Sequence, residues 1–340
     1  MNGNMRFYPL ALPRIPAGRV LAWLLFMAMT SWAAMAILYS GPPYAARVLA
    51  ACFFVVAAFL SFTVPRGELR KTAWFLSVFA PVLAWWLLLP PSNDRDWRPD
   101  VARLPSAAIS GGTAFIRGIR DFDYRSENDY AVRYYDAALD LGSLRSMDLF
   151  LVDWGLPHIA HTMLSFGFEG DKYVCFSIET RNEKGERFSA VGSFFKRYEL
   201  TYVVADERDA VRLRTNYRKG EKVYLYRLKA PPELIRLIFL DYLRSVNRLK
   251  ERPEWYKALT GNCTTGIWRH FAPYYPKAKF DWRILASGHA GEMAYELGAL
   301  DKTFSYQELK RRSLINYRSN AAGRDRNFSK LIRHGLPGFE

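Results

Sequence analysis

The segment HTMLSFGFEGDKYVCFSIE, residues 161–179, decides the fold of the larger part of this chain. Two runs rich in β-branched and aromatic residues flank the turn Glu-Gly-Asp, and this pattern predicts a β-hairpin. With a three-residue loop, Phe168 faces Lys172, and counting outward sets His161 opposite Glu179 on one face of the sheet. A two-residue loop would shift the partner of His161 by one residue and move the carboxylate to the other face.

The elements after the hairpin mix strands and helices. In one stretch the apolar residues recur at three- and four-residue steps after a proline suited to a first helical turn, which predicts a helix. Antiparallel strands with helices packed on them make an α+β domain. The predicted elements are strands at 198–205 and 222–228, a helix at 232–250, and shorter helices after Asn262, around 291–300 and at 305–314.

The first 90 residues have a different composition. Apolar runs occupy residues 20–38, 48–64 and 73–89. About 20 apolar residues span a bilayer core and about 17 is the lower limit, so the runs predict three transmembrane helices. The domains expected are a cytoplasmic segment at 1–19, a membrane region at 20–92 and one globular domain at 93–340. A cleaved signal peptide is the alternative for the first run, which is however too long and is followed by two more.

The cations that flank the runs predict their orientation. Three arginines precede the first run and three cations lie between the second and the third, whereas the first connection holds only Arg47. The cation-rich sides are therefore expected in the cytoplasm and the large domain outside. Arg95 and Arg98 after the third run oppose this orientation, and the domain would lie inside if residues 48–64 did not span. The cations counted are Arg6, Arg14, Arg19, Arg66, Arg70 and Lys71.

The formal net charge is +15, with many cations in residues 208–222. We interpret that stretch as a solvated face or as a surface that attracts anionic lipid headgroups. Nucleic acid is not an expected partner for a domain outside the membrane.

Cys175 is expected to be a core thiol, because its strand position lies too far from the site proposed for Cys263 to form a disulfide.

The stretch GNCTTGIWRH, residues 261–270, predicts a helix with a cysteine at its start. Gly261 ends the preceding structure and Asn262 is a strong N-cap residue. The sulfur of Cys263 then lies where unpaired amides and the helix dipole favour negative charge, and a thiolate is the nucleophilic form of cysteine. Asn262, Thr264 and Thr265 belong to the same first turn and form the candidate cap and oxyanion region.

His161 is the preferred base for this thiol, with Glu179 as the orienting carboxylate. Nucleophile, base and orienting group together are the general arrangement for covalent catalysis. A structural role for His161 remains an alternative. A second alternative is that Glu179 simply pairs with the neighbouring Arg181. His270 lies too far along the helix to reach the sulfur.

The other histidines give weaker signals. His289 and His334 remain open as bases. His158 and His161 are three residues apart, but two histidines without a further ligand are a weak indication of zinc. We therefore expect neither a metal nor a cofactor.

Several segments carry a resemblance to a known family: RDFDYR (120–125), IAHTMLSFGF (159–168), FSIETR (176–181), DERDAVRLRTN (206–216) and EWYKALTGNCTTGI (254–267). They resemble the Lnb N-terminal periplasmic domain family of bacterial lipoprotein N-acyltransferases. The resemblance implies a permuted papain-like fold related to NlpC-type peptidases and lecithin:retinol acyltransferase. It also implies that Cys263 is the nucleophile and His161 the base, in a periplasmic domain held at the bacterial inner membrane by several spans.

The function expected from this resemblance is a thiol acyltransferase. It would move an acyl chain from a membrane phospholipid to an amine such as a lipoprotein N-terminus through a thioester. A cysteine peptidase or amidase acting on peptidoglycan peptides uses the same residues, and a catalytically silent binding scaffold is a third possibility. A lipid substrate predicts an apolar groove beside Cys263, whereas a cell-wall peptide predicts a polar one.

Overall fold

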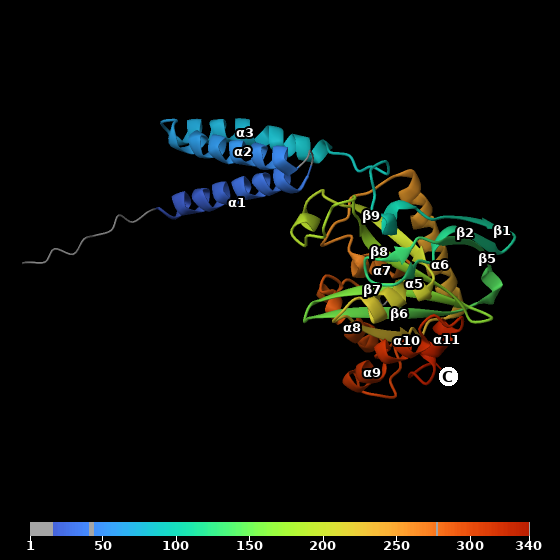
Figure 1. Cartoon of the computed structure of the whole chain (residues 1–340). Coiled ribbons are helices and arrows are strands. Elements are labelled where there is room, and N and C mark those ends of the chain that lie inside the picture. Colours follow the sequence, from blue (N-terminus) through green and yellow to red (C-terminus); the bar gives the residue numbers. More distant parts are fainter. Residues whose placement is uncertain (1–15, 41–43, 277, 340) are drawn as a thin grey trace, which may run out of the picture. The chain divides into compact units, whose positions relative to one another are not determined.

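The computed structural model describes residues 16–40, 44–276 and 278–339, and the chain divides into two compact units between Pro90 and Pro91 (Figure 1). The first unit holds three helices that are long and apolar enough to cross a membrane, as predicted. Residues 1–15 of the expected cytoplasmic segment lie outside the described residues. The helices are α1 (Ala17–Tyr39), α2 (Tyr44–Thr63) and α3 (Glu68–Leu88).

The third helix begins earlier than its apolar run. Because α3 starts at Glu68, Arg70 and Lys71 lie in its first turns and not in the connection where they were expected. The apolar run marks only the part of a helix that matches the hydrocarbon core, whereas backbone hydrogen bonding continues where water is available.

The second unit is an α+β domain, which confirms the predicted fold class. Its eight-stranded sheet has the order β1-β2-β9-β8-β7-β6-β10, and β5 pairs with β2. The strands are β1 (Ser106–Ser110), β2 (Thr113–Arg120), β5 (Tyr134–Asp140), β6 (Leu144–Leu156), β7 (Ile159–Phe168), β8 (Lys172–Arg181), β9 (Glu199–Ala205) and β10 (Lys222–Arg227), with β3 (Asp123–Tyr124) and β4 (Tyr130–Ala131) forming a separate pair. The helices are α4 (Pro99–Ala102), α5 (Glu207–Arg212), α6 (Pro232–Glu251), α7 (Cys263–Phe271), α8 (Ala290–Glu296), α9 (Tyr306–Arg312), α10 (Asn316–Ala322) and α11 (Phe328–Arg333).

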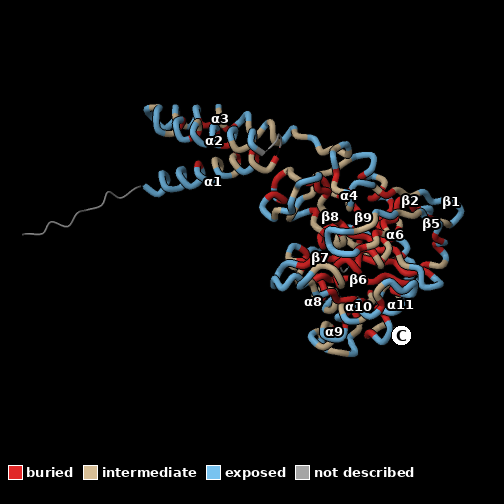
Figure 2. Tube along the Cα trace, in the orientation of Figure 1, coloured by how far each residue is buried: buried red, intermediate tan, exposed pale blue. Residues whose placement is uncertain are grey.

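The sheet is buried on both faces (Figure 2). Because side chains alternate along a strand, Leu149 and Leu151 of β6 join the cluster under α6, whereas Phe150 and Val152 join the cluster under α5, α10 and α11. The long helix α6 follows the predicted apolar stripe. Its Phe239 contacts the rings of aromatic residues on β7 and β8 edge-on, pairs that add about 0.5–1.5 kcal/mol each beyond area burial.

The second face also holds buried ion pairs that the sequence analysis did not anticipate. The guanidinium of Arg333 binds Asp148 at 2.9 Å and Glu207 at 2.6 Å. Arg120 binds both carboxylate oxygens of Asp209 at 2.8 Å. Removing one partner of such a pair costs about 3–5 kcal/mol, because the other charge is left buried alone. These pairs join strands β2 and β6 to α5 and α11.

The predicted hairpin register is confirmed. The β7–β8 ladder runs from Phe168 opposite Lys172 to Met163 opposite Ser177. Beyond that point β7 continues beside β6 and β8 continues beside β9, so the two strands part. His161 and Glu179 lie where the strands part, which opens the sheet for a pocket.

Candidate active site

The start of α7 fixes the position of the candidate nucleophile. The Asn262 side chain accepts a hydrogen bond from the Thr265 amide at 2.8 Å, and Cys263 is the first residue of the helix. A Cβ on Gly266 would lie 2.4 Å from the Ile178 side chain, so glycine lets the helix approach β8 closely. Because the cap occupies the amide of Thr265, the first-turn amides left for an oxyanion are those of Cys263 and Thr264.

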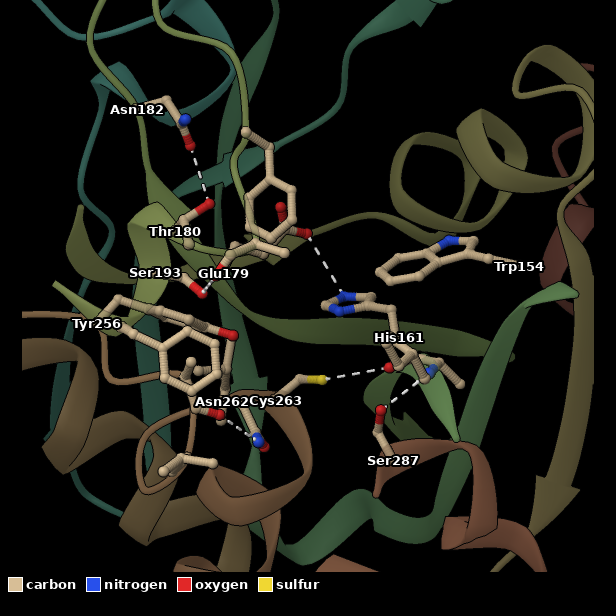
Figure 3. Close-up of a pocket in the computed structure, with 18 of the residues that line it drawn as sticks. Trp154, His161, Glu179, Thr180, Asn182, Ser193, Tyr256, Asn262, Cys263 and Ser287 are labelled. Atoms are coloured by element: carbon tan, nitrogen blue, oxygen red, sulfur yellow. Dashed lines mark hydrogen bonds and ion pairs between the residues drawn. The ribbon is translucent and has the colours of Figure 1, made fainter. Parts of the chain in front are cut away.

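Cys263, His161 and Glu179 line one pocket with a volume of about 450 Å³ (Figure 3). This volume lies in the range of about 300–1,000 Å³ that small-molecule sites occupy. The sulfur of Cys263 lies 3.9 Å from the carbonyl oxygen of Ala160, the residue before His161. Figure 3 shows the sulfur and the imidazole projecting into the same space. Cys263 reaches the pocket from the α7 face of the sheet, and His161 reaches it from the gap between the parted strands.

The hydrogen bonds of His161 assign its tautomer. Ser177 Oγ lies 2.7 Å from His161 Nε2 and donates its own proton to Glu179 Oε1, also at 2.7 Å. A hydroxyl has one proton, so Ser177 must accept from the histidine, and the proton of the neutral imidazole is on Nε2. The lone pair of Nδ1 is then free to accept a proton, and that nitrogen has no hydrogen-bond partner among the residues the structure describes. The base is therefore oriented by Glu179 through Ser177.

The charges around the imidazole keep it neutral. The pKa of His161 is lowered to about 3, mainly by burial and then by the nearby cation Arg214, against the opposing effect of Glu179. Burial would raise the pKa of Glu179, but Arg214 at 3.4 Å, together with His161 and Arg120, holds it below its usual range. At neutral pH the site therefore holds an ionised carboxylate and an unprotonated imidazole.

Arg214 comes from a segment that the sequence analysis misjudged. It lies in a π-helical turn, Leu213–Tyr217, directly after α5, and only 5% of it is exposed. The cation-rich stretch 208–222 was expected to be a solvated face or to attract lipid headgroups; Arg214 instead turns inward to Glu179 and Glu221. Its carboxylate partners compensate for its burial, and none of them is adjacent to it in sequence.

The alternative partner of Glu179 is excluded. Arg181 instead binds the Val101 carbonyl at 3.0 Å, the Ala102 carbonyl at 2.8 Å and the Asn93 side chain at 2.9 Å. Glu179 is thus left for Ser177 and Arg214. The residues that bind Arg181 belong to the segment that follows the third membrane helix.

Of the remaining histidines, His158 also lines this pocket, whereas His270 and His334 lie elsewhere. His270 binds Asp241 and Tyr202, each at 2.7 Å, at the far end of α7. His289 stacks on His158 with their ring nitrogens 2.9 Å apart, and His334 is exposed at the end of α11. The residues that the structure describes contain no group of three or more histidine, cysteine or acidic side chains arranged to hold a metal ion.

The cysteines that are not in the pocket are unpaired thiols. Cys175 is fully buried on the second face of the sheet, and burial raises its pKa well above the ordinary value, which makes it a poor nucleophile. Cys52 lies on the surface of α2. Cys263 is also unpaired, and it is the cysteine that lines the pocket.

Apolar side chains form much of the pocket wall, and several of them are exposed: Trp154, Ile159, Phe188, Phe194, Leu259 and Leu285. Tyr256 adds a phenol whose pKa burial raises, so that it stays protonated. The sequence analysis missed Ser177, Arg214 and Tyr256. Alternation from Glu179 places Ser177 on the same face as His161; no comparable signal exists for Arg214 or Tyr256, which long-range packing brings in.

Comparisons with known proteins identify part of this domain. Residues 130–288 match the family model of the Lnb N-terminal periplasmic domain. The matched residues contain His161, Ser177, Glu179, Arg214 and Cys263, which supports the family suggested by the sequence motifs. Searches of curated proteins and of solved structures gave no match.

Proposed function

Starting from the likeness of residues 130–288 to a periplasmic domain, we propose that this chain is a membrane-anchored cysteine acyltransferase. It takes an acyl chain from a phospholipid and passes it to an amine such as a lipoprotein N-terminus. The observation that carries the proposal is the oriented, unprotonated imidazole of His161 in one apolar-walled pocket with the thiol of Cys263, the first residue of α7. We further propose a multi-pass protein of the bacterial inner membrane with a permuted papain-like domain in the periplasm.

The first half of the reaction forms a thioester. His161 Nδ1 takes the proton of Cys263 as the sulfur attacks the ester carbonyl of the phospholipid. The amides of Cys263 and Thr264 donate to the oxyanion of the tetrahedral intermediate, in a position of the kind where one donor contributes about 10²–10³ in rate. As the intermediate collapses, the carbon–oxygen bond breaks and the imidazolium gives its proton to the departing lysophospholipid.

The second half transfers the chain. An amine attacks the thioester carbonyl, the carbon–sulfur bond breaks, and the amine proton passes through His161 to the thiolate. An amide product and the free thiol result. Glu179 stays ionised throughout and stabilises the transient imidazolium through Ser177, which offsets the unfavourable effect of Arg214 on that charge.

The pocket wall favours a lipid over a cell-wall peptide. A phospholipid offers long apolar chains beside a polar ester, and the exposed aromatic and aliphatic side chains of the wall suit such a ligand. A peptidoglycan stem peptide is charged and would need convergent polar groups along its whole length. This pocket also has polar lining residues, among them Asp100, Asn182 and Ser287, so the preference for a lipid rests on the exposed apolar side chains of its wall.

The full-length protein in nanodiscs of phosphatidylethanolamine and phosphatidylglycerol tests the proposal. Intact mass and peptide mapping should find an acyl chain on Cys263 that hydroxylamine removes, and Cys263→Ala should lack it. Adding a synthetic peptide with a diacylglyceryl-cysteine N-terminus should move the chain to its amine.

Other outcomes separate the alternatives. Release of free fatty acid without acylated peptide, or cleavage of peptidoglycan stem peptides, would indicate a hydrolase. An unmodified Cys263 with none of these products would leave a binding scaffold. Cys175→Ala is the matched control, because it removes a thiol that lies on the far side of the sheet from α7.

A further inference from the structure

One wall of the pocket carries a group of strongly exposed apolar side chains. Phe188 is 59% exposed, Val191 44%, Phe194 58% and Leu259 54%. Phe188, Phe194 and Leu259 also line the pocket. The Ala258 amide donates to the Ser193 carbonyl at 3.2 Å, so the two chain segments that supply these residues lie side by side. We call these four residues the apolar wedge.

The wedge is held in place and is not a frayed loop. The Ser189 amide donates to the hydroxyl of Tyr198 at 2.8 Å, and that hydroxyl donates to the Arg187 carbonyl at 3.0 Å. The ring of Phe188 stacks on that of Tyr198. Tyr198 itself is fully buried, so a core residue fixes the outward position of Phe188.

The segment that follows the membrane helices is fastened to the base of the same loop. The Arg95 guanidinium binds the Glu183 carboxylate at 2.9 Å. The Lys184 amide donates to the backbone carbonyl of Asp96 at 2.7 Å, and the Arg98 amide donates to the backbone carbonyl of Asn182 at 3.0 Å. The Ser92 amide already contacts Glu199 of the domain. Ser92 follows Pro90, the last residue of the first unit, by two positions, so the linker between the two units is short.

Three exposed cations lie near the wedge in the sequence, and one of them, Lys184, pairs with Asp96 at 2.6 Å. Lys184 and Arg187 precede Phe188 in the loop and are exposed, and Lys257 is exposed two residues before Leu259. Lysine and arginine side chains around exposed apolar side chains match the boundary between anionic headgroups and acyl chains. A protein partner would more often be met by aromatic residues ringed by mixed polar groups.

We propose that the apolar wedge inserts into the membrane surface, at the boundary between headgroups and acyl chains, and brings the mouth of the pocket against the bilayer. The inserted side chains are Phe188, Val191, Phe194 and Leu259. The proposal concerns a lipid surface as the partner and does not require acyl transfer, because it follows from exposure, charge and attachment.

Spin labels on the full-length protein test the insertion. The background is Cys52→Ser with Cys263→Ser, and the fully buried Cys175 stays. Labels are placed at Phe188→Cys and Phe194→Cys, with Tyr317→Cys and Leu331→Cys as controls on exposed apolar residues of α10 and α11. In phosphatidylethanolamine–phosphatidylglycerol nanodiscs, oxygen should reach the wedge labels several-fold better than a water-soluble nickel complex does, and the control labels should show the reverse.

Two results would overturn the proposal. Wedge labels as accessible to nickel as the label at residue 331 would mean that the wedge stays in water. Wedge labels shielded from both reagents, in nanodiscs and in detergent alike, would mean that a protein surface or a second copy covers them.

The accessibility measurement is independent of catalysis, so a failure of insertion and a failure of the proposed reaction give different results. In the otherwise native chain, Val191→Ser changes the wedge residue that does not line the pocket, and it should slow thioester formation several-fold from nanodisc lipid but not from a monomeric short-chain phospholipid. Leu331→Ser should change neither rate. Equal slowing with both substrates would assign the wedge to the pocket wall alone and contradict a role at the membrane.

Discussion

Two buried histidines, His161 on β7 and His270 on α7, differ in the hydrogen-bond partners of their ring nitrogens. Both are almost fully buried and both lie near a carboxylate, and burial lowers the pKa of each. His270 has Asp241 on Nδ1 and Tyr202 on Nε2, and it stacks on Tyr242 with ring centroids 3.8 Å apart. His161 has Ser177 on Nε2, while its Nδ1 side faces a pocket.

The difference separates a structural histidine from a candidate base. A base needs one nitrogen held and the other available for a proton, whereas His270 has both nitrogens occupied and is locked in place. Burial and a depressed pKa do not distinguish the two residues. His161 lies in the pocket beside Cys263, the first residue of α7. His270 lies near the C-terminus of the same helix, within the core.

The largest expected effect comes from exchanging the two histidines for alanine. His161→Ala should slow acylation of Cys263 by about 10²–10⁴-fold, the usual contribution of a general base, with little loss of stability. His270→Ala should leave the acylation rate of folded protein nearly unchanged but lower the free energy of unfolding by about 1–3 kcal/mol, because buried Tyr202 and half-buried Asp241 each lose a hydrogen-bond partner. Rates from nanodisc assays and thermal unfolding of the full chain measure both. A similar loss of rate in the two variants would remove the distinction.

The relay through Ser177 should have a smaller effect. Ser177→Ala leaves the Nε2 proton without its acceptor and cuts the link to Glu179, and we expect a roughly tenfold lower acylation rate, about 1.4 kcal/mol. Ser177→Thr keeps the hydroxyl and should recover most of the rate. Thr180→Val serves as the control, because it removes a hydroxyl from the same strand, one that donates to the Asn182 side chain and not to Glu179. An unchanged rate in Ser177→Ala would show that Glu179 does not orient the base.

The pH dependence follows from the lowered pKa of His161. Its folded pKa of about 3 lies below the unfolded value of about 6.5, so between these values the unfolded chain binds a proton that the native state does not. Stability from this group is complete above pH 6.5 and falls toward pH 3, by up to about 1.4 kcal/mol per pH unit. The acid limb of the acylation rate should likewise lie well below pH 6.5.

Arg214→Met tests the cause of that shift. Without the cation, the pKa of His161 should rise and the acid limb should move toward higher pH. Arg311→Met removes an exposed arginine that pairs with Glu308 and should leave the profile in place. Coincident profiles for wild type and Arg214→Met would mean that burial alone sets the pKa.

The sequence predicted the parts of this site that depend on local pattern. Strand alternation and loop length placed His161 opposite Glu179, and cap chemistry placed Cys263 at a helix start. The parting of β7 and β8 was not predictable, because it depends on the long-range pairing of β7 with β6 and of β8 with β9, which continues where the hairpin ladder ends. That parting turns a directly opposed pair into one bridged by Ser177.

Arg214 and the buried pairs show where such reasoning ends. A run of arginines and lysines is usually a solvated face, and the partners that bury Arg214 and Arg120 come from distant segments. Their burial is favourable only because those carboxylates are present, and single-sequence periodicity carries no information on that pairing. The strands before the hairpin, β1 to β6, were likewise not placed from the sequence.

The smallest expected effect concerns the N-cap of α7. Asn262→Ala removes the acceptor for the Thr265 amide and should lower the free energy of unfolding by about 1 kcal/mol, whereas Asn262→Asp should keep the cap. Because Cys263 follows the cap directly, amide exchange should quicken at residues 264–266 in Asn262→Ala and stay slow around His270. If the cap fixes the position of the sulfur, the rate at which Cys263 reacts with a soluble thiol reagent should change in Asn262→Ala together with the rate of amide exchange. A change of exchange without any change of thiol reactivity would assign the position of Cys263 to the packing of Gly266 on Ile178 instead.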